Sequence, residues 1–138
     1  MKSPAAIMIG PDQPLVIDEI DVPEPGPNQV IVKQTATGVC ASQIHELTKT
    51  PQEKCPCVLG HEGVGVVTHV GKNVTHLQEG DWAIITWVPR AGYPGRGFVE
   101  GLSPIGSKYQ DTLVGGSIGT FTEHCLASDQ LAVKIPAE

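Results

Sequence analysis

Two short segments of the chain carry residue types that can bind a metal ion. Segment 38–45 reads GVCASQIH and segment 59–65 reads LGHEGVG. A thiolate, an imidazole and a carboxylate, here from Cys40, His61 and Glu62, are the ligand types that a catalytic zinc ion uses, with one coordination position left open. An ion with an open position lowers the pKa of a bound hydroxyl group and stabilises the oxyanion that results. Together, the two segments favour a zinc centre.

Taken singly, each of these signals has an ordinary structural explanation. An isolated cysteine is most often a small apolar filler of the core, and an isolated histidine is more often a hydrogen-bonded polar residue than a ligand. A GHEG sequence by itself fits a turn beside a strand. The metal-site interpretation gains weight because both segments occur in this order, between apolar runs that fit strands.

Proton transfer is the second chemistry that segment 38–45 suggests. Ser42 follows Cys40 by two residues, and His45 follows Ser42 by three. Residues three apart in a helical turn share one face, so Ser42 and His45 can form a hydroxyl-to-imidazole relay leading away from the metal. Histidine side chains exchange protons near neutral pH, which suits the outer end of such a relay.

The elements that must position these residues are short. Apolar or alternating runs cover 5–9, 15–22, 30–35, 64–70, 82–87, 121–127 and 131–135, and Gly/Pro turns separate them. Segment 41–49 is the best helix candidate, with Ser42 as its cap and with Ile44 and Leu47 on one face. Segment 89–120 is rich in glycine and is predicted to be a long loop. Many short strands with almost no helix predict a small barrel or sandwich.

Composition bounds the remaining possibilities. The chain has 138 residues, which suits a single domain, and 40% are hydrophobic, which suffices for a core. Its net charge is −6 and its Lys and Arg residues form no run, so we expect no nucleic-acid partner. No apolar stretch approaches the roughly 20 residues of a membrane span. We expect a soluble cytoplasmic protein whose four cysteines are reduced thiols.

Further segments make a family resemblance specific. They are PEPGPNQVIVK at 23–33, VLGHEGVGVV at 58–67, VGKNVT at 70–75, EGDW at 79–82 and FTEH at 121–124. With GVCASQIH, this set resembles the zinc-dependent alcohol dehydrogenases of the medium-chain dehydrogenase/reductase superfamily. The resemblance covers the whole chain except segment 89–120. It implies that residues 1–138 are the catalytic domain, a mainly β, GroES-like open barrel with few short helices.

The same resemblance implies roles for individual residues. Cys40 and His61 correspond to zinc ligands, and Glu62 corresponds to an acidic neighbour that approaches the metal during exchange of water or substrate. Ser42 corresponds to the hydroxyl group that takes the substrate proton, and His45 to the next member of the relay. The implied cofactor is one catalytic zinc ion, and the implied substrate is an alcohol that is oxidised to an aldehyde or ketone.

Other positions match the family less closely or depart from it. Trp87 falls where relatives often place an aromatic residue of the substrate pocket. Ala41 replaces a His or Arg that reaches the cofactor phosphates in many relatives. Between Trp87 and Thr120 there is no cysteine, which excludes the four-cysteine structural zinc site of many relatives. Segment 55–57, a Cys-Pro-Cys sequence, has no partner pair and is interpreted as structural or incidental.

The largest departure concerns the dinucleotide. Relatives carry a further zinc cysteine and the Gly-rich NAD(P) fingerprint in a following Rossmann domain, and no G-x-G-x-x-G motif follows a strand in this chain. We therefore expect NAD or NADP to bind only with a Rossmann domain, and the chain alone to be inactive. The sequence leaves open a truncated gene product, an expressed domain or half of a split enzyme.

A second function class remains beside the enzyme. A GroES-like domain without its cofactor partner can serve as a non-enzymatic metal-binding or protein-interaction module. Exposure of the surface that normally packs on the Rossmann domain would favour a Rossmann-domain partner chain or a second copy of this chain.

Overall fold

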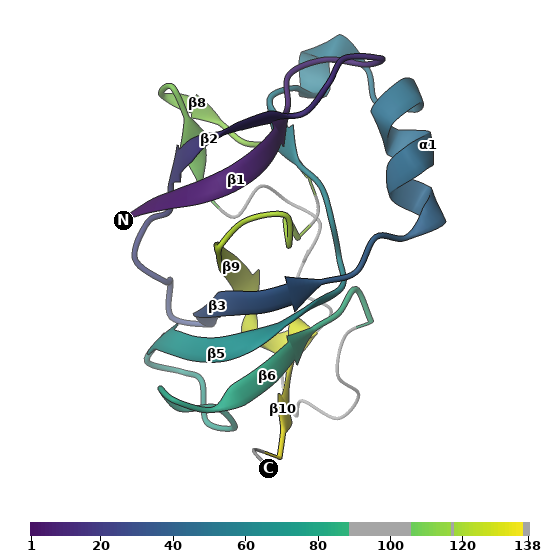
Figure 1. The fold of residues 1–138 in the computed structure, drawn as a ribbon. Helices are drawn as coiled ribbons and strands as arrows, with labels where there is room; N and C mark the ends of the chain where they lie inside the picture. The colour runs from purple at the N-terminus through teal and green to yellow at the C-terminus, as the bar shows by residue number, and fades with distance from the viewer. Residues whose placement is uncertain (89–105, 117, 137–138) are drawn as a thin grey trace.

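Two five-stranded sheets form the fold in a computed structural model that describes residues 1–88, 106–116 and 118–136. In order, the first sheet contains β4 (Cys57–Val58), β1 (Lys2–Met8), β2 (Val16–Asp21), β7 (Lys108–Tyr109) and β8 (Thr112–Leu113). The second contains β10 (Ala132–Ile135), β6 (Trp82–Ile85), β5 (Gly63–Val70), β3 (Gln29–Thr37) and β9 (His124–Ser128). The described helical elements are α1 (Ala41–Lys49) and the 3₁₀ turns η1 (Gln52–Lys54) and η2 (Asp129–Leu131). This confirms the mainly β, curled architecture expected from the sequence (Figure 1).

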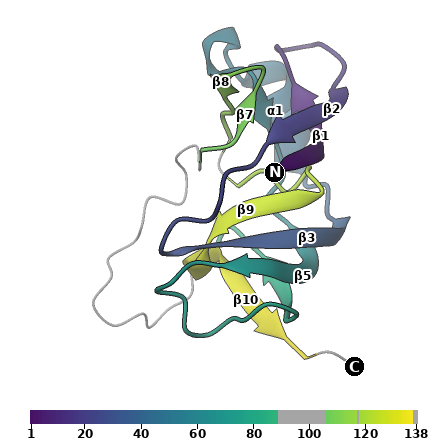
Figure 2. The same cartoon turned by 90° about the vertical axis from the view of Figure 1, so that its left-hand side faces the viewer.

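The first half of strand β3 is buried on both faces and contacts both clusters of the core. Because successive side chains of a strand point to opposite faces, Val30 and Val32 enter one core cluster while Ile31 enters the other. All three are at most 1% exposed. Burying an aliphatic side chain of this size contributes about 1.5–3 kcal/mol. Burial of residues 30–32 therefore stabilises the packing of the second sheet, which lies below the first in Figure 2.

The pairing of β3 with β5 places the ends of the two strands together. The strands are antiparallel, and Thr37 near the end of β3 pairs with Gly63 at the start of β5. The register shifts at Ile31/Val32 and again between Gln34 and Ala36. Such bulges increase the local twist and bend a strand, which lets the sheet curl. They leave the C-terminal end of β3 at the rim of the half-barrel (Figure 1).

Helix α1 packs beside this rim with a different face inward from the one predicted. Cys40, not Ser42, is the N-cap residue. Gln43 is 2% exposed and Leu47 packs on the Met8 cluster, whereas Ile44 is 66% exposed. The expected face of Ile44 with Leu47 was therefore wrong. Gln43 and Leu47, four residues apart, form the inward face. The helix therefore buries the polar side chain of Gln43 and exposes the apolar side chain of Ile44.

The predicted loop 89–120 contains regular structure in its described part. Strands β7 and β8 form a hairpin whose two turn residues, Gln110 and Asp111, have φ angles of 46° and 66°. Two successive positive φ values are the mark of a type I′ turn, which matches strand twist. Residues 89–105 and 117 lie outside the described residues. In the described residues, no helix is both long and apolar enough to span a membrane.

Candidate metal centre

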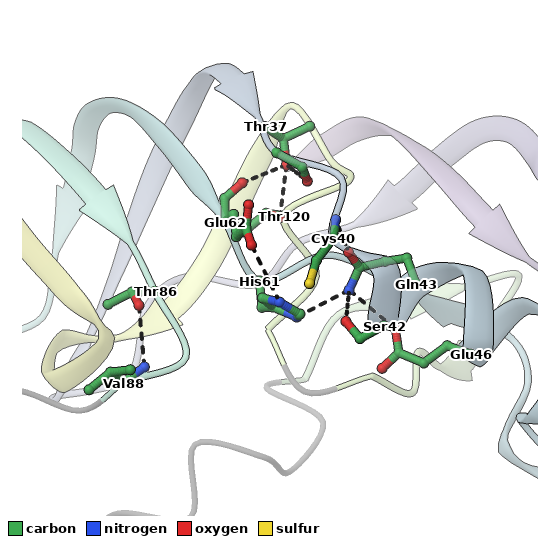
Figure 3. A network of polar contacts seen from close by, with 11 residues as sticks. Thr37, Cys40, Ser42, Gln43, Glu46, His61, Glu62, Thr86, Val88 and Thr120 are labelled. Atoms are coloured by element: carbon green, nitrogen blue, oxygen red, sulfur yellow. Dashed lines mark hydrogen bonds and ion pairs between the residues drawn. The ribbon is translucent and has the colours of Figure 1, made fainter.

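The two sequence segments meet at one point of the fold because β3 and β5 are antiparallel neighbours. Cys40 lies three residues beyond Thr37, and His61 lies two residues before Gly63, the residue paired with Thr37. The chain therefore leaves β3 and enters β5 at the same edge of the sheet. Figure 3 shows the side chains of Cys40 and His61 turned toward each other there.

Three candidate ligand atoms lie together at this edge. The thiol sulfur of Cys40, a ring nitrogen of His61 and a carboxylate oxygen of Glu62 are all within 4.8 Å of one another. Thiolate and imidazole ligands lie about 2.0–2.3 Å from zinc, so two of them on one tetrahedral ion are about 3.5 Å apart. Closing the observed separation requires side-chain movements of about 1 Å. The donor set and its spacing fit a zinc ion.

Backbone contacts hold Glu62 in place while its side chain stays accessible. The carbonyl oxygen of Glu62 accepts hydrogen bonds from the Gly38 amide and from the Thr37 hydroxyl, both at 2.8 Å. A Cβ atom at Gly38 would meet the Glu62 carboxylate, so a larger residue there would displace that side chain. Gly60 has a φ of 94°, a conformation that glycine adopts without strain. It turns the chain so that His61 faces Cys40.

Gln43 connects helix α1 to the centre and was not among the residues predicted from the sequence. Its Oε1 accepts a hydrogen bond from the Cys40 amide at 2.8 Å. Its Nε2 carries two hydrogens and faces three polar atoms, Nδ1 of His61 at 3.1 Å, Ser42 Oγ at 3.1 Å and Glu46 Oε2 at 3.3 Å, so these contacts share two N–H groups. The usual capping signal is a Gln or Glu three residues after a Ser or Thr cap; because the cap here is Cys40, no such signal marks Gln43 in the sequence.

A cleft of about 400 Å³ opens beside the candidate ligands. His61, Glu62 and Trp87 are among the residues that line it. Trp87 follows the end of β6, where the Val88 amide donates to Thr86 Oγ1 at 3.3 Å (Figure 3). At 61% exposure, the Trp87 side chain is free to contact a molecule that enters the cleft.

A comparison with protein families decides to which family this arrangement belongs. Residues 26–137 match the family described as "Alcohol dehydrogenase GroES-like domain". The chain belongs to this family. The match includes every candidate site residue, from Cys40 to Trp87.

Curated relatives of this GroES-like domain are alcohol dehydrogenases and related dehydrogenases. It is 36% identical over 140 residues to the alcohol dehydrogenase of Rhizobium meliloti (strain 1021), covering 99% of this chain and 41% of the relative. It is 45% identical over 93 residues to the S-(hydroxymethyl)glutathione dehydrogenase of Photobacterium damsela subsp. piscicida, covering 67% of this chain and 25% of the relative. The chain thus spans well under half the length of these relatives.

Solved structures agree on the fold of the GroES-like domain. The alcohol dehydrogenase zinc-binding domain protein from Burkholderia ambifaria superposes with a TM-score of 0.80 at 24% identity, over 100% of this chain and 43% of that one. The 2R,3R-butanediol dehydrogenase from Bacillus subtilis superposes with a TM-score of 0.69 at 26% identity, over 97% of this chain and 40% of that one.

Ser42 and His45 lie on the same helix of this GroES-like domain, and their surroundings differ. Ser42 is half-buried next to Gln43, whereas His45 is exposed. Among the described residues, no hydrogen bond joins the Ser42 hydroxyl to the His45 ring. The relay between them stays a prediction, and it requires a rotation of His45 or an intervening water molecule.

Proposed function

We propose that this domain holds one zinc ion on Cys40 and His61, with Glu62 beside it, and is the catalytic part of a zinc-dependent, NAD(P)-linked alcohol dehydrogenase. The observation that carries this proposal is the convergence of the three ligand atoms within 4.8 Å. It occurs inside a domain of the alcohol dehydrogenase GroES-like family. The reaction proposed is oxidation of an alcohol to an aldehyde or ketone.

The alcohol substrate binds in the cleft beside the candidate ligands. A bound zinc ion would supply Lewis acidity, which lowers the pKa of a hydroxyl group beside it. His61 and Glu62 line the cleft, so an alcohol that enters brings its hydroxyl group to the ligand cluster. Trp87 lines the same cleft and is the candidate contact for the carbon side of the alcohol.

Ser42 and His45 give the alcohol proton a way to solvent. Ser42 lies two residues after Cys40, and its oxygen already accepts a hydrogen bond from Gln43. Its hydroxyl group takes the substrate proton as it releases its own. His45 lies one helical turn further on and is exposed, so it receives that proton and exchanges it with water.

The hydride acceptor needs protein beyond the residues of this chain. Relatives that match over almost the whole chain are more than twice as long as the matched part. We place NAD or NADP on a Rossmann domain, supplied by a partner chain or by further sequence. The alcohol pocket is completed by the same partner.

Metal analysis tests the zinc site directly. The purified chain, reconstituted with Zn²⁺ and dialysed, should contain close to one zinc per chain by mass spectrometry of the metal. Cys40→Ser and His61→Ala should each reduce this content strongly. Cys55→Ser, which changes another half-buried thiol outside the cluster, is the matched control and should retain it. A zinc-free wild-type chain, or equal loss in the control, would contradict the proposal.

Activity requires the second half. The zinc-loaded chain is mixed with the separately produced dinucleotide-binding half of an alcohol dehydrogenase relative, NAD or NADP, and a panel of primary and secondary alcohols. Reduced dinucleotide should form, and Ser42→Ala should slow it while zinc content is unchanged. Zinc binding without activity in every pairing would favour the non-enzymatic metal-binding or interaction module.

A further inference from the structure

Gln43 is a buried polar side chain in contact with His61, and its amide has only one favourable orientation. Oε1 accepts from the Cys40 amide at 2.8 Å, and Nε2 donates to a carboxylate oxygen of Glu46 at 3.3 Å. Turning the amide over would place two donors face to face at Cys40 and two acceptors face to face at Glu46. Because a backbone N–H only donates and an ionised carboxylate only accepts, these two contacts fix the orientation independently of His61.

This orientation dictates the proton position on the His61 ring. Nε2 of Gln43, a donor only, lies 3.1 Å from Nδ1 of His61. Nδ1 must then be the nitrogen without a proton, and a neutral imidazole carries its single proton on the other nitrogen. That other nitrogen, Nε2, is 3.8 Å from Oε1 of Glu62 and is the ring atom that faces the ligand cluster.

A metal ion on His61 needs the opposite arrangement. A metal ligand must offer its lone pair from Nε2, so the proton has to move to Nδ1, and metal-binding histidines usually donate that N–H to a carboxylate or carbonyl. Here the N–H would point at the NH₂ group of Gln43. Relieving this contact requires the Gln43 amide to turn over, which sacrifices its hydrogen bonds with both Cys40 and Glu46.

We infer that Gln43 is a positioning residue that holds His61 in the tautomer unsuited to zinc. It thereby keeps the zinc affinity of this centre below the value that the same ligands would have with a hydrogen-bond acceptor beside Nδ1 of His61. This inference rests on the proposed zinc site. Partners of metal-bound histidines change metal affinity on the order of 10–100-fold. A carboxylate in place of the Gln43 amide should restore that factor.

The side chains at positions 43 and 46 can be exchanged with each other in a matched variant. In Gln43→Glu with Glu46→Gln, the carboxylate and the amide swap positions, so the net charge is unchanged. The new carboxylate can accept from the Cys40 amide, from the new amide at 46, and from the Nδ1–H of His61. Glu46→Gln alone is the control, because it alters Glu46 and leaves the Gln43–His61 contact in place.

Two measurements test the inference. Zinc affinity is measured by competition of Zn²⁺ with a chromophoric chelator, and the exchanged variant should bind zinc 10–100-fold more tightly than wild type, with the control within about threefold. The His61 tautomer is measured by long-range ¹H–¹⁵N NMR correlation on metal-free protein at pH 8. Wild type should carry the proton on Nε2, and the exchanged variant on Nδ1.

Either measurement can overturn the inference. A metal-free wild type with its proton on Nδ1, or an exchanged variant whose zinc affinity stays within threefold of wild type, would do so. If neither protein binds zinc, the proposed function fails, but the NMR measurement still decides whether Gln43 sets the tautomer. Thermal unfolding of each variant verifies that it is folded before either result is used.

Discussion

The hydroxyl groups of Thr37 and Thr120 lie 2.9 Å apart and join the end of β3 to the segment that precedes β9. The Thr37 hydroxyl also donates to the carbonyl oxygen of Glu62 at 2.8 Å, so its own proton is used there and Thr120 must be the donor in the contact between them. Thr120 is 1% exposed. This pair of bonds fastens the metal-centre segment to the barrel, as Figure 3 shows.

Replacing Thr37 should therefore weaken both the fold and the site. Thr37→Val keeps the shape of the side chain but leaves the buried Thr120 hydroxyl without the acceptor that the structure gives it. The expected loss is about 1–2 kcal/mol in the free energy of unfolding, measured by urea denaturation. Thr35→Val, on the same strand and exposed, is the control and should change stability by less than about 0.5 kcal/mol. Equal effects of the two substitutions would show that the hydroxyl pair contributes nothing.

The meeting of Cys40 with His61 follows from features that the sequence carries. The strand at 30–35 and the strand at 64–70 were both predicted. The first ends just before segment 38–45, and the second begins within segment 59–65. The sequence does not state that these strands pair antiparallel with Thr37 opposite Gly63, because strand register depends on contacts across the whole sheet. The family resemblance supplied that missing link.

The face of helix α1 was predicted wrongly for an instructive reason. A helical period assigns apolar side chains to the inward face, which favoured Ile44 over Gln43. The helix instead packs beside a polar centre, where Gln43 satisfies three partner residues besides His61. Burial of an amide is favourable where its hydrogen bonds are made, and such partners come from distant segments that periodicity does not record.

The hairpin of β7 and β8 was missed because its turn lacks the usual residues. Type I′ turns normally contain Asn or Gly at positions with positive φ. Here Gln110 and Asp111 take those positions. Pairing of β7 with β2 and the hydrogen bond from Tyr109 to Asp18 at 3.1 Å hold the hairpin instead.

Two glycines near the site should respond differently to alanine. At Gly38, the added Cβ would meet the carboxylate at the end of the flexible Glu62 side chain, which can rotate away. At Gly65, it would clash with the backbone oxygen of Lys33, which cannot move without separating β3 from β5. Gly38→Ala should cost about 1 kcal/mol or less and weaken zinc binding by less than tenfold. Gly65→Ala should cost about 3 kcal/mol or more.

Urea denaturation and the zinc competition assay separate these outcomes. The informative comparison is the ratio of the two effects within each variant. Gly38→Ala should change the zinc affinity more than the free energy of unfolding. Gly65→Ala should mainly lower the free energy of unfolding. A Gly38→Ala protein as unstable as Gly65→Ala would mean that the Glu62 carboxylate is held rigidly.

The four thiols should differ strongly in reactivity. Burial raises the pKa of Cys125 to about 12, and burial followed by the neighbouring Cys55 raises the pKa of Cys57 to about 12. At pH 8 such thiols have on the order of 10³-fold fewer thiolates than an ordinary cysteine. A short pulse of iodoacetamide on the folded, metal-free protein should label Cys40 and Cys55 well before Cys57 and Cys125, as read by peptide mass spectrometry.

Two controls accompany the labelling experiment. In denaturant all four thiols should react alike, which shows that the protection comes from the fold. Added Zn²⁺ should protect Cys40 and leave Cys55 unchanged, because Cys55 lies outside the ligand cluster. Rapid labelling of Cys125 in the folded chain would contradict its burial.

The ion pair between Asp81 and Lys134 should make stability depend on acid pH. Lys134 Nζ lies 2.7 Å from Asp81 Oδ1, the Gln78 amide donates to the same carboxylate at 3.0 Å, and the Asp81 side chain is 10% exposed. The hydrogen bond from Lys134, helped by that amide and opposed by burial, lowers the pKa of Asp81 below its ordinary value. Folding thus favours the ionised form. The resulting stabilisation is complete above the unfolded carboxyl pKa of about 3.9 and is lost as the pH falls through the lower folded value.

Asp81→Asn should accordingly lower the urea midpoint at pH 7, and its curve should converge with that of wild type as the pH falls below about 4. Asp21→Asn is the control, because the side chains of Lys2 and Asp21 are 59% and 51% exposed and solvent screens their pairing. Its midpoint should follow wild type at every pH. A gap between wild type and Asp81→Asn that stays constant from pH 7 to pH 2.5 would mean that the carboxylate charge is not what joins β10 to the turn before β6.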